Sequence, residues 1–188
     1  MNVYDLDKTI NLTDCSTDFF FFCLKRKPSL VFNAIGMLPH FIGWKAGKKS
    51  LTQFKEKVFS YLKKIENVDL YVEEFWDINI KKSHGWYQNV QKQDDLVISA
   101  SPEFLIAPAC KRLGIKNYMA SRVDKKTGKF TGLNCSGEEK VKRFREVYGN
   151  TTIEKFYSDS YSDTPLALIA RESYMITKGK ISPWVFKK

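Results

Sequence analysis

The sequence predicts an α/β fold in which a parallel sheet carries a long helical insertion after its first strand. The chain of 188 residues opens with a short apolar strand that stops at Asp5. Residues 14–92 have helical patterns throughout, and strand and helix patterns alternate afterwards. Such alternation is typical of parallel sheets, whose strands are joined by crossover helices. We therefore expect one domain from residues 1–13 and 93–188 and a helical domain from residues 14–92.

Composition supports a single compact core with this insertion. The hydrophobic share is 43%, and no segment approaches the roughly 20 apolar residues of a membrane span. A secretory signal is not expected, because the first residues already form a strand. The four cysteines form no C-x-x-C pair, so we expect reduced thiols in a cytoplasmic protein that pack as small apolar side chains.

Positive charge is concentrated in the expected helical domain. The net charge is +10, and the segment from Lys25 to Lys64 holds ten basic residues and one acid, Glu56. Such a surface attracts phosphorylated substrates, anionic lipid or nucleic acid, although a solvated helical face has the same composition. Nucleic acid is not expected as a partner, because no recognisable RNA- or DNA-binding motif accompanies the charge.

Several helices are expected in this domain. Ser16 or Thr17 can cap the first, whose phenylalanines at 19–22 cover all of its sides and are buried or line a lid. The stretch 30–44 is apolar but interrupted by glycine and proline, and it is either a buried, kinked helix or an interfacial membrane segment. Apolar residues at helical spacing predict an amphipathic helix over 51–65. Two further helices are expected over 68–80 and 85–91.

The second half has the alternation that defines the sheet. Buried-strand patterns occupy 96–99, 117–120, 153–157 and 174–177, and helix patterns occupy 103–113, 137–148 and 164–171. A hairpin is expected over 123–133, where Asp124 and Gly128 mark a turn.

Two carboxylates follow the first strand. If extended geometry persists, Asp5 and Asp7 leave the strand on the same face. Carboxylates aimed at one point repel each other, and a hard cation such as Mg²⁺ is their natural partner. The alternative is that acidic residues simply end a strand in a turn. The rest of the chain decides between the two interpretations.

Further polar residues follow the later strands. They are Ser99 with Ala100, Lys140 near a helix start, and Asp159 with Asp163, which add to Asp5, Asp7 and Thr9 after the first strand. Parallel strands direct their C-terminal ends to one edge of a sheet, so these groups can converge. Four carboxylates and one ammonium need a divalent cation for balance. The lysine, the hydroxyls and free backbone N–H groups suit a phosphate.

These residues match a known family. D-L-D-K-T at 5–9, I-S-A-S-P-E-F at 98–104, the lysine of C-S-G-E-E-K at 140 and S-D-S-Y-S-D-T-P at 158–165 occur in order. The chain resembles the haloacid dehalogenase superfamily of aspartate-dependent phosphatases, near the branch of phosphoserine phosphatase and phosphatidylglycerophosphatase. The resemblance implies a Rossmann-like parallel-sheet core with an inserted all-helical cap.

The resemblance also implies roles. Asp5 attacks phosphorus and ligates Mg²⁺, while Asp7 acts as acid and base and offers its backbone carbonyl to the metal. Asp159 binds the metal, and Asp163 binds it through water or positions Lys140. Ser99 and Ala100 bind the phosphate, and Thr9 orients Asp7 or the nearby phosphate-binding backbone. Lys140 neutralises charge.

The sequence departs from the family pattern at a few positions. Lys8 replaces the commoner glycine after the second aspartate, where it adds charge to the site mouth or is a solvated loop lysine. Ser158 and Ser160 flank Asp159 where many relatives have glycines. Neither departure removes a charge from the site, so activity is expected to survive.

The sequence indicates the substrate less clearly than it indicates the reaction. Asp14 stands nine positions after Asp5, where phosphoserine phosphatases carry an acid that meets the substrate ammonium, but it can equally cap the first inserted helix. The aromatic and basic stretches favour a bulky or lipid phosphomonoester. Three hypotheses stay open: a phosphatase of soluble metabolites, a lipid phosphatase held peripherally at the inner membrane face, and a non-catalytic binding module, which the intact Asp7 disfavours.

Overall fold

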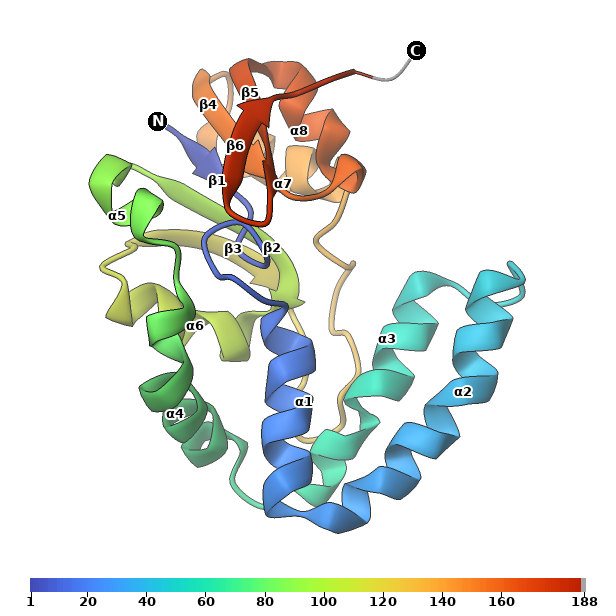
Figure 1. Cartoon of the computed structure of the whole chain (residues 1–188). Helices are drawn as coiled ribbons and strands as arrows, with labels where there is room; N and C mark the ends of the chain where they lie inside the picture. Colours follow the sequence, from blue (N-terminus) through green and yellow to red (C-terminus); the bar gives the residue numbers. More distant parts are fainter. Residues whose placement is uncertain (187–188) are drawn as a thin grey trace.

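A computed structural model describes residues 1–186 of the chain as a six-stranded sheet with helices around it (Figure 1). The strand order is β3-β2-β1-β4-β5-β6. Strands β1 to β5 are parallel, and β6 runs antiparallel to β5. Their bounds are Val3–Tyr4, Leu96–Pro102, Asn117–Ser121, Ile153–Ser158, Ala170–Thr177 and Lys180–Pro183 for β1 to β6. The predicted α/β fold with a parallel sheet is confirmed.

The shortest strand, β1, lies at the centre of the sheet. It pairs with β2 on one side and β4 on the other, and its two residues are fully buried. The backbone N–H of Asp5 donates to the carbonyl of Tyr157, 2.8 Å away, which continues the β4 pairing by one residue. Asp5 therefore lies at the C-terminal edge of the sheet, between the ends of its two central neighbours.

Alternate residues of β1 enter different hydrophobic cores, as the two-residue period of a strand requires. Val3 joins a cluster that contains Phe144 of helix α7 (Glu138–Tyr148) and Leu166 of α8 (Thr164–Ile169). Tyr4 joins the larger cluster on the opposite face, which includes residues of α6 (Glu103–Arg112). Helices therefore cover both faces of the sheet.

The segment between β1 and β2 is helical, as predicted. Its helices are α1 (Cys15–Arg26), α2 (Val31–Lys45), α3 (Leu51–Phe59), α4 (Val68–Asn79) and α5 (Gly85–Val90). Asp14, and not Ser16 or Thr17, is the N-cap of α1, because its side chain accepts a 2.8 Å hydrogen bond from the N–H of Thr17. The aspartate has the extended backbone that an N-cap needs.

The phenylalanine run of α1 is divided between core and surface. Phe19 and Phe20 are buried, and Phe19 meets Phe75 of α4 edge-on at 5.4 Å, whereas Phe21 is 54% exposed. The amphipathic helix expected over 51–65 ends early, at Phe59, and continues as the 3₁₀ turn Ser60–Lys64. The Ser60 hydroxyl donates to the carbonyl of Lys57, which helps to explain the change of helix type.

Helix α2 differs from one expectation, because no residue of it is buried. It packs on α3 through ring contacts such as the stacked pair Trp44 and Phe54 at 5.3 Å, and it is an outlying helix in Figure 1. The interpretation as a buried, kinked helix is therefore wrong. In residues 1–186, no helix is long and apolar enough to cross a membrane.

The C-terminal elements also differ from expectation. Helix α8 ends at Ile169, and β5 begins directly afterwards at Ala170, earlier than predicted. Strand β6 was not predicted. It returns through a two-residue turn at Lys178 and Gly179, both with positive φ, which is the backbone that a tight hairpin requires.

The predicted hairpin over 123–133 is present and contacts the inserted helices. Val123 pairs with Phe130, and the N–H of Phe130 donates to the Glu56 carboxylate of α3 at 3.1 Å. At the hairpin tip, Gly128 has φ of +73°, and a Cβ added there would lie 2.3 Å from the carbonyl oxygen of Phe59. The backbone of the hairpin therefore fits against the end of α3 only with glycine at this position.

We expect Gly128→Ala to lower the free energy of unfolding by about 3 kcal/mol, from backbone strain and a backbone clash together. Gly47→Ala is the matched control, because Gly47 also has positive φ but nothing within 4 Å of the added Cβ. The control should lose only about 1 kcal/mol. Urea unfolding measures both. If both variants lost the same free energy of unfolding, the close contact between Gly128 and α3 would not contribute to the loss.

Candidate active site

A cavity of about 430 Å³ lies at the C-terminal edge of the central strands and is also lined by residues of helices α1 and α3. Five aspartates and three lysines line it, so carboxylates outnumber ammonium groups. They are Asp5, Asp7, Asp14, Asp159 and Asp163 with Lys8, Lys55 and Lys140. Groups that lie far apart in the sequence are thus brought to one edge of the sheet, as parallel-strand geometry predicts.

A buried lysine links two of these aspartates. Lys140, in the first turn of α7, donates to Oδ1 of Asp5 at 2.7 Å and to Oδ2 of Asp163 at 2.8 Å. The Ser158 hydroxyl donates to the same Asp163 oxygen at 2.8 Å. Lys140 and Asp163 are almost completely buried. The ammonium therefore holds the carboxylates from the ends of β1 and β4 in fixed positions.

Burial dominates the electrostatics of this group. It raises the pKa of Asp5 to about 7; Lys140 opposes the shift, and the charges of Asp163 and Asp7 add to it. Burial alone would lower the pKa of Lys140, but Asp5 and Asp163 more than offset that effect and raise it. The lysine is thus held as a cation, and one cation does not compensate the neighbouring carboxylates.

Asp7 is held by groups from α1 and β2. The N–H of Cys15 donates to its Oδ1 at 2.7 Å, and the Ser101 hydroxyl donates to its Oδ2 at 2.6 Å. The Ser99 hydroxyl lies 3.5 Å from the same Oδ2. Burial raises the pKa of Asp7, and Asp14 adds to the effect. The sequence placed Ser101 beside Ser99 at the end of this strand, but the hydrogen bond from Ser101 to Asp7 was not predicted.

Two carboxylates of the cavity, those of Asp5 and Asp159, have oxygens without a side-chain donor in the described part of the chain. Among residues 1–186, no side chain donates to Oδ2 of Asp5 or to the carboxylate of Asp159. Burial raises the pKa of Asp159; Lys8 opposes the shift, and Asp163 and Asp7 add to it. Carboxylate oxygens without side-chain donors, on residues that line one cavity, are the kind of ligand that Mg²⁺ prefers.

Few side chains would hold a metal at this site. Within residues 1–186, no group of three or more His, Cys, Asp or Glu side chains is placed to hold an ion. The arrangement implied by the family resemblance uses only two carboxylates, Asp5 and Asp159, with the backbone carbonyl of Asp7. The two carboxylates and Asp7 line the same cavity, so the residues present fit this arrangement.

Three predicted phosphate-binding residues are placed differently from one another. Ala100 lines the cavity. Ser99 is fully buried behind it, where its hydroxyl accepts from the N–H of Ser101 at 3.0 Å. Thr9 is fully buried, and its hydroxyl has no hydrogen-bond partner in the part of the chain that the structure describes. The structure therefore brings Ala100 to the cavity surface but not Ser99 or Thr9, because both side chains turn into the protein.

Lys8 and Asp14 lie at the cavity as well. Lys8 has φ of +54°, a left-handed conformation that favours glycine, which gives a physical reason for the glycine of many relatives. It is exposed and close enough to Asp159 to influence that carboxylate. Asp14 lines the cavity and also caps α1, so the two alternatives for this residue are compatible.

Helix α3 contributes a lysine that sequence reasoning counted only as surface charge. The half-buried Lys55 donates from Nζ to the carbonyl of Ala100 at 3.0 Å and to Oδ1 of Asn134 at 2.9 Å. Burial lowers its pKa, while Asp7 and Asp14 act in the opposite direction. No local motif could have identified it, since its role depends on how α3 is placed over the sheet.

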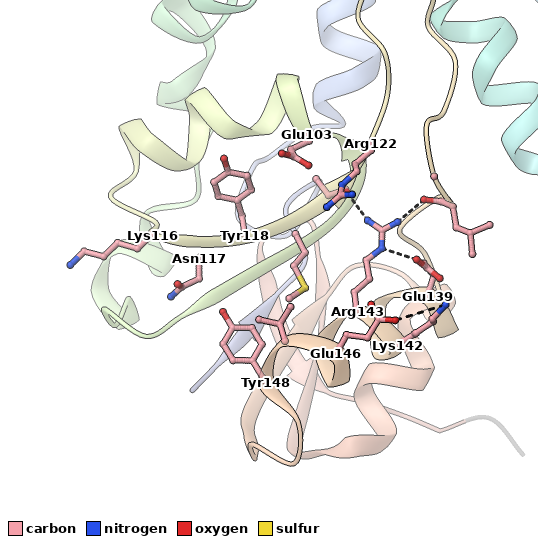
Figure 2. A pocket seen from close by; sticks show the side chains of 15 residues that line it. Glu103, Lys116, Asn117, Tyr118, Arg122, Glu139, Lys142, Arg143, Glu146 and Tyr148 are labelled. Atoms are coloured by element: carbon pink, nitrogen blue, oxygen red, sulfur yellow. Dashed lines mark hydrogen bonds and ion pairs between the residues drawn. The ribbon is translucent and has the colours of Figure 1, made fainter.

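A second cavity, of about 660 Å³, lies along the edge strand β3 and is larger than the first (Figure 2). Its central charge is already paired, because Arg143 donates to Glu139 at 2.7 Å and to the carbonyls of Ala120 and Leu133. None of the predicted site residues lines it. The smaller cavity is therefore the candidate active site.

Comparisons with known proteins show the family to which the chain is similar. The family model described as haloacid dehalogenase-like hydrolase matches residues 3–168. Protein CicA of Caulobacter vibrioides is 33% identical over 103 residues, which cover 51% of this chain and 46% of that protein. A histidinol-phosphatase of Neisseria meningitidis is 32% identical over 94 residues, which cover 42% of this chain and 41% of that enzyme. The chain thus matches less than half of each of these relatives.

A solved structure shows the same fold over nearly the whole chain. It is a protein of unknown function from Bordetella pertussis Tohama I, with a TM-score of 0.74 and 20% sequence identity. The superposition covers 92% of this chain and 87% of that one. At this identity the likeness concerns the fold, including the helices between the first two strands.

Proposed function

The chain belongs to the haloacid dehalogenase-like hydrolase family, and we propose that it is a Mg²⁺-dependent phosphatase of phosphomonoesters. One observation carries the proposal: Lys140 bridges Asp5 and Asp163 in a buried position, while Asp7 and Asp159 line the same cavity. The histidinol-phosphatase relative supports phosphate-ester hydrolysis as the reaction class. The residues of this chain can be assigned to each part of such a reaction.

Asp5 is the nucleophile in this proposal. Its Oδ1 accepts from Lys140, Oδ2 has no donor in residues 1–186, and the residue lines the cavity. Attack by Oδ2 forms a bond to phosphorus while the bond from phosphorus to the ester oxygen breaks, which leaves an aspartyl-phosphate. The ammonium of Lys140 keeps the attacking carboxylate in place and reduces the repulsion between it and the phosphate.

Asp7 is the acid and base. Its carboxyl protonates the leaving ester oxygen and later takes a proton from the water that hydrolyses the aspartyl-phosphate and releases inorganic phosphate. The Cys15 N–H and the Ser101 hydroxyl fix its two oxygens at 2.7 and 2.6 Å, so Ser101 is a positioning residue for this step. A carboxyl group that is restrained at both oxygens has little conformational freedom left to lose when the substrate binds.

The metal is assigned to Asp5, Asp159 and the backbone carbonyl of Asp7, with Asp163 as an indirect partner through Lys140. When bound, Mg²⁺ supplies positive charge that offsets the negative charge of the phosphoryl group. Ala100, with its neighbour Ser101, provides the wall against which the phosphoryl oxygens rest, and the Ser99 hydroxyl, which accepts from the N–H of Ser101, supports that wall from behind.

The helical segment 14–92 acts as a cap in this proposal, and the core comprises residues 1–13 and 93–188. Helix α3 supplies Phe54, Lys55 and Val58 to the cavity, so the group attached to the phosphate meets residues of the segment. Asp14 adds a carboxylate that suits a cationic substrate group. A lipid phosphomonoester is the second candidate, and the exposed apolar residues of α2 favour it.

Hydrolysis of p-nitrophenyl phosphate tests the proposal. We expect turnover in the presence of Mg²⁺, loss of turnover with excess chelator, and recovery when Mg²⁺ is returned. A screen of soluble and lipid phosphomonoesters then identifies the preferred class. Turnover that is insensitive to chelation would contradict the metal assignment, and absence of turnover on every phosphomonoester would contradict the reaction class.

Lys55→Met should lower kcat/KM for p-nitrophenyl phosphate by about 30-fold, because a charge-assisted hydrogen bond at the cavity is lost. Lys57→Met is the matched control on the same helix, since Lys57 does not line the cavity and should stay within about twofold of the wild type. Steady-state kinetics measure both variants. Equal effects would indicate that the net charge of α3, rather than the position of Lys55, matters.

A further inference from the structure

Helix α2 carries a stripe of exposed apolar side chains. Val31, Ile35, Leu38 and Ile42 recur at spacings of four, three and four residues, which places them on one face of the helix. Their exposed fractions are 43%, 64%, 60% and 59%. Phe32, beside this stripe, is 71% exposed. We call these five residues the outer face of α2.

The opposite side of α2 is the side that packs. Trp44 stacks on Phe54 of α3 at 5.3 Å, and Phe41 meets Phe54 at 5.7 Å. The side chains of Lys57 and Lys49 lie against Gly36 and Gly43. The pairing of α2 with α3 is therefore complete without the outer face. An apolar stripe that the fold does not use and leaves in water indicates an interaction surface.

Positive charge lies at the C-terminal end of the outer face. Lys45 ends α2, and Lys48 and Lys49 follow in the loop, while residues 28–55 contain no acidic residue. Lys45 and Lys48 are exposed. A helix with a wide apolar face and flanking lysines is the pattern of segments that lie in the interface of a bilayer, where acyl chains meet the apolar side and anionic headgroups meet the lysines.

We propose that the outer face of α2 docks on the surface of a membrane that contains anionic lipid, with Lys45 and Lys48 at the headgroups. Charge complementarity selects this occupant over a second copy of the chain. In a symmetric pair formed through this face, the lysines of both copies would be brought together without acids between them. An anionic bilayer provides an apolar layer and negative charge at once.

Docking in this orientation would place the candidate active site close to the membrane. Helix α3 packs on α2 through Phe54, and it lines the cavity with Phe54, Lys55, Val58 and Phe59. The cavity is thus separated from the docked helix by a single helix. The docking proposal itself does not depend on phosphatase activity, because lipid binding is measured without any substrate.

Co-sedimentation with vesicles tests the proposal on the full chain. We expect binding to vesicles of phosphatidylcholine with phosphatidylglycerol, weaker binding at high salt, and little binding to phosphatidylcholine alone. The double variant Ile35→Glu/Leu38→Glu should weaken binding at least about 10-fold, since it removes apolar side chains and adds charge at the interface. Val147→Glu is the control, because Val147 is 67% exposed on α7, away from α2.

The altered side chains are exposed, so thermal unfolding of both variants should match that of the wild type, and this measurement excludes misfolding. The proposal is overturned if the wild-type chain does not bind the anionic vesicles, or if the double variant binds them as well as Val147→Glu does. It is also overturned if size-exclusion chromatography shows that the wild type and Val147→Glu are dimers and that the double variant is a monomer. The outer face would then be covered by a second copy.

Discussion

Asp5→Asn is expected to reduce turnover of p-nitrophenyl phosphate by at least about 10³-fold. The amide has nearly the shape of the carboxylate, but it lacks the negative oxygen that attacks phosphorus, and it is a poorer metal ligand. Asp163, the other carboxylate that Lys140 contacts, does not replace it, because Asp163 is almost completely buried and also accepts from Ser158. Steady-state kinetics at saturating Mg²⁺ measure the loss.

The loss from Asp5→Asn should occur in a folded protein. Asp5 is buried among other carboxylates, and Lys140 keeps Asp163 as a partner after the change. We therefore expect that, when both proteins are measured without metal, the midpoint of thermal unfolding of Asp5→Asn is at least as high as that of the wild type. Asp94→Asn, at an exposed aspartate outside the cavity, is the control and should keep full turnover. Wild-type turnover in Asp5→Asn would remove the nucleophile from the proposed function.

The sequence was most informative where chemistry follows a strand. Asp5, Asp7, Asp159 and Asp163 all line one cavity, because the C-terminal ends of parallel strands share an edge, and strand ends are visible as apolar runs. Lys140 could be predicted from its motif, but its two hydrogen bonds could not, since they depend on how α7 packs on the sheet.

The contribution of the helical segment was not readable in the same way. Lys55 reaches the cavity only because α3 lies over the sheet edge, a tertiary arrangement that has no local pattern. Helix α2 illustrates a related limit, because apolar residues at helical spacing fit a buried helix and an interfacial helix equally well. Strand β6 is a different case. A short, exposed edge strand has little hydrophobic signal, and the positive φ of its turn at Lys178 and Gly179 is known only from the structure.

Lys140→Met is expected to be the most destabilising change at the site. Methionine keeps most of the volume, but Asp5 and Asp163 lose the ammonium that lies 2.7 and 2.8 Å from them. Removing one partner from a buried ion pair costs about 3–5 kcal/mol, because the remaining charge stays buried without compensation. Urea unfolding without metal measures this loss. Lys142→Met, at an exposed position on the same helix, should change stability by less than about 0.5 kcal/mol.

A second substitution separates the structural role of Lys140 from its role in turnover. In Lys140→Met/Asp163→Asn, one of the two uncompensated carboxylates becomes neutral, so part of the lost stability should return. Activity should not return. The attacking carboxylate would still lack its ammonium, and removal of such preorganised charge costs about 10²–10³ in kcat. If the double variant regained both stability and turnover, Lys140 would be needed only to neutralise Asp163, and its assignment to the phosphoryl-transfer step would be wrong.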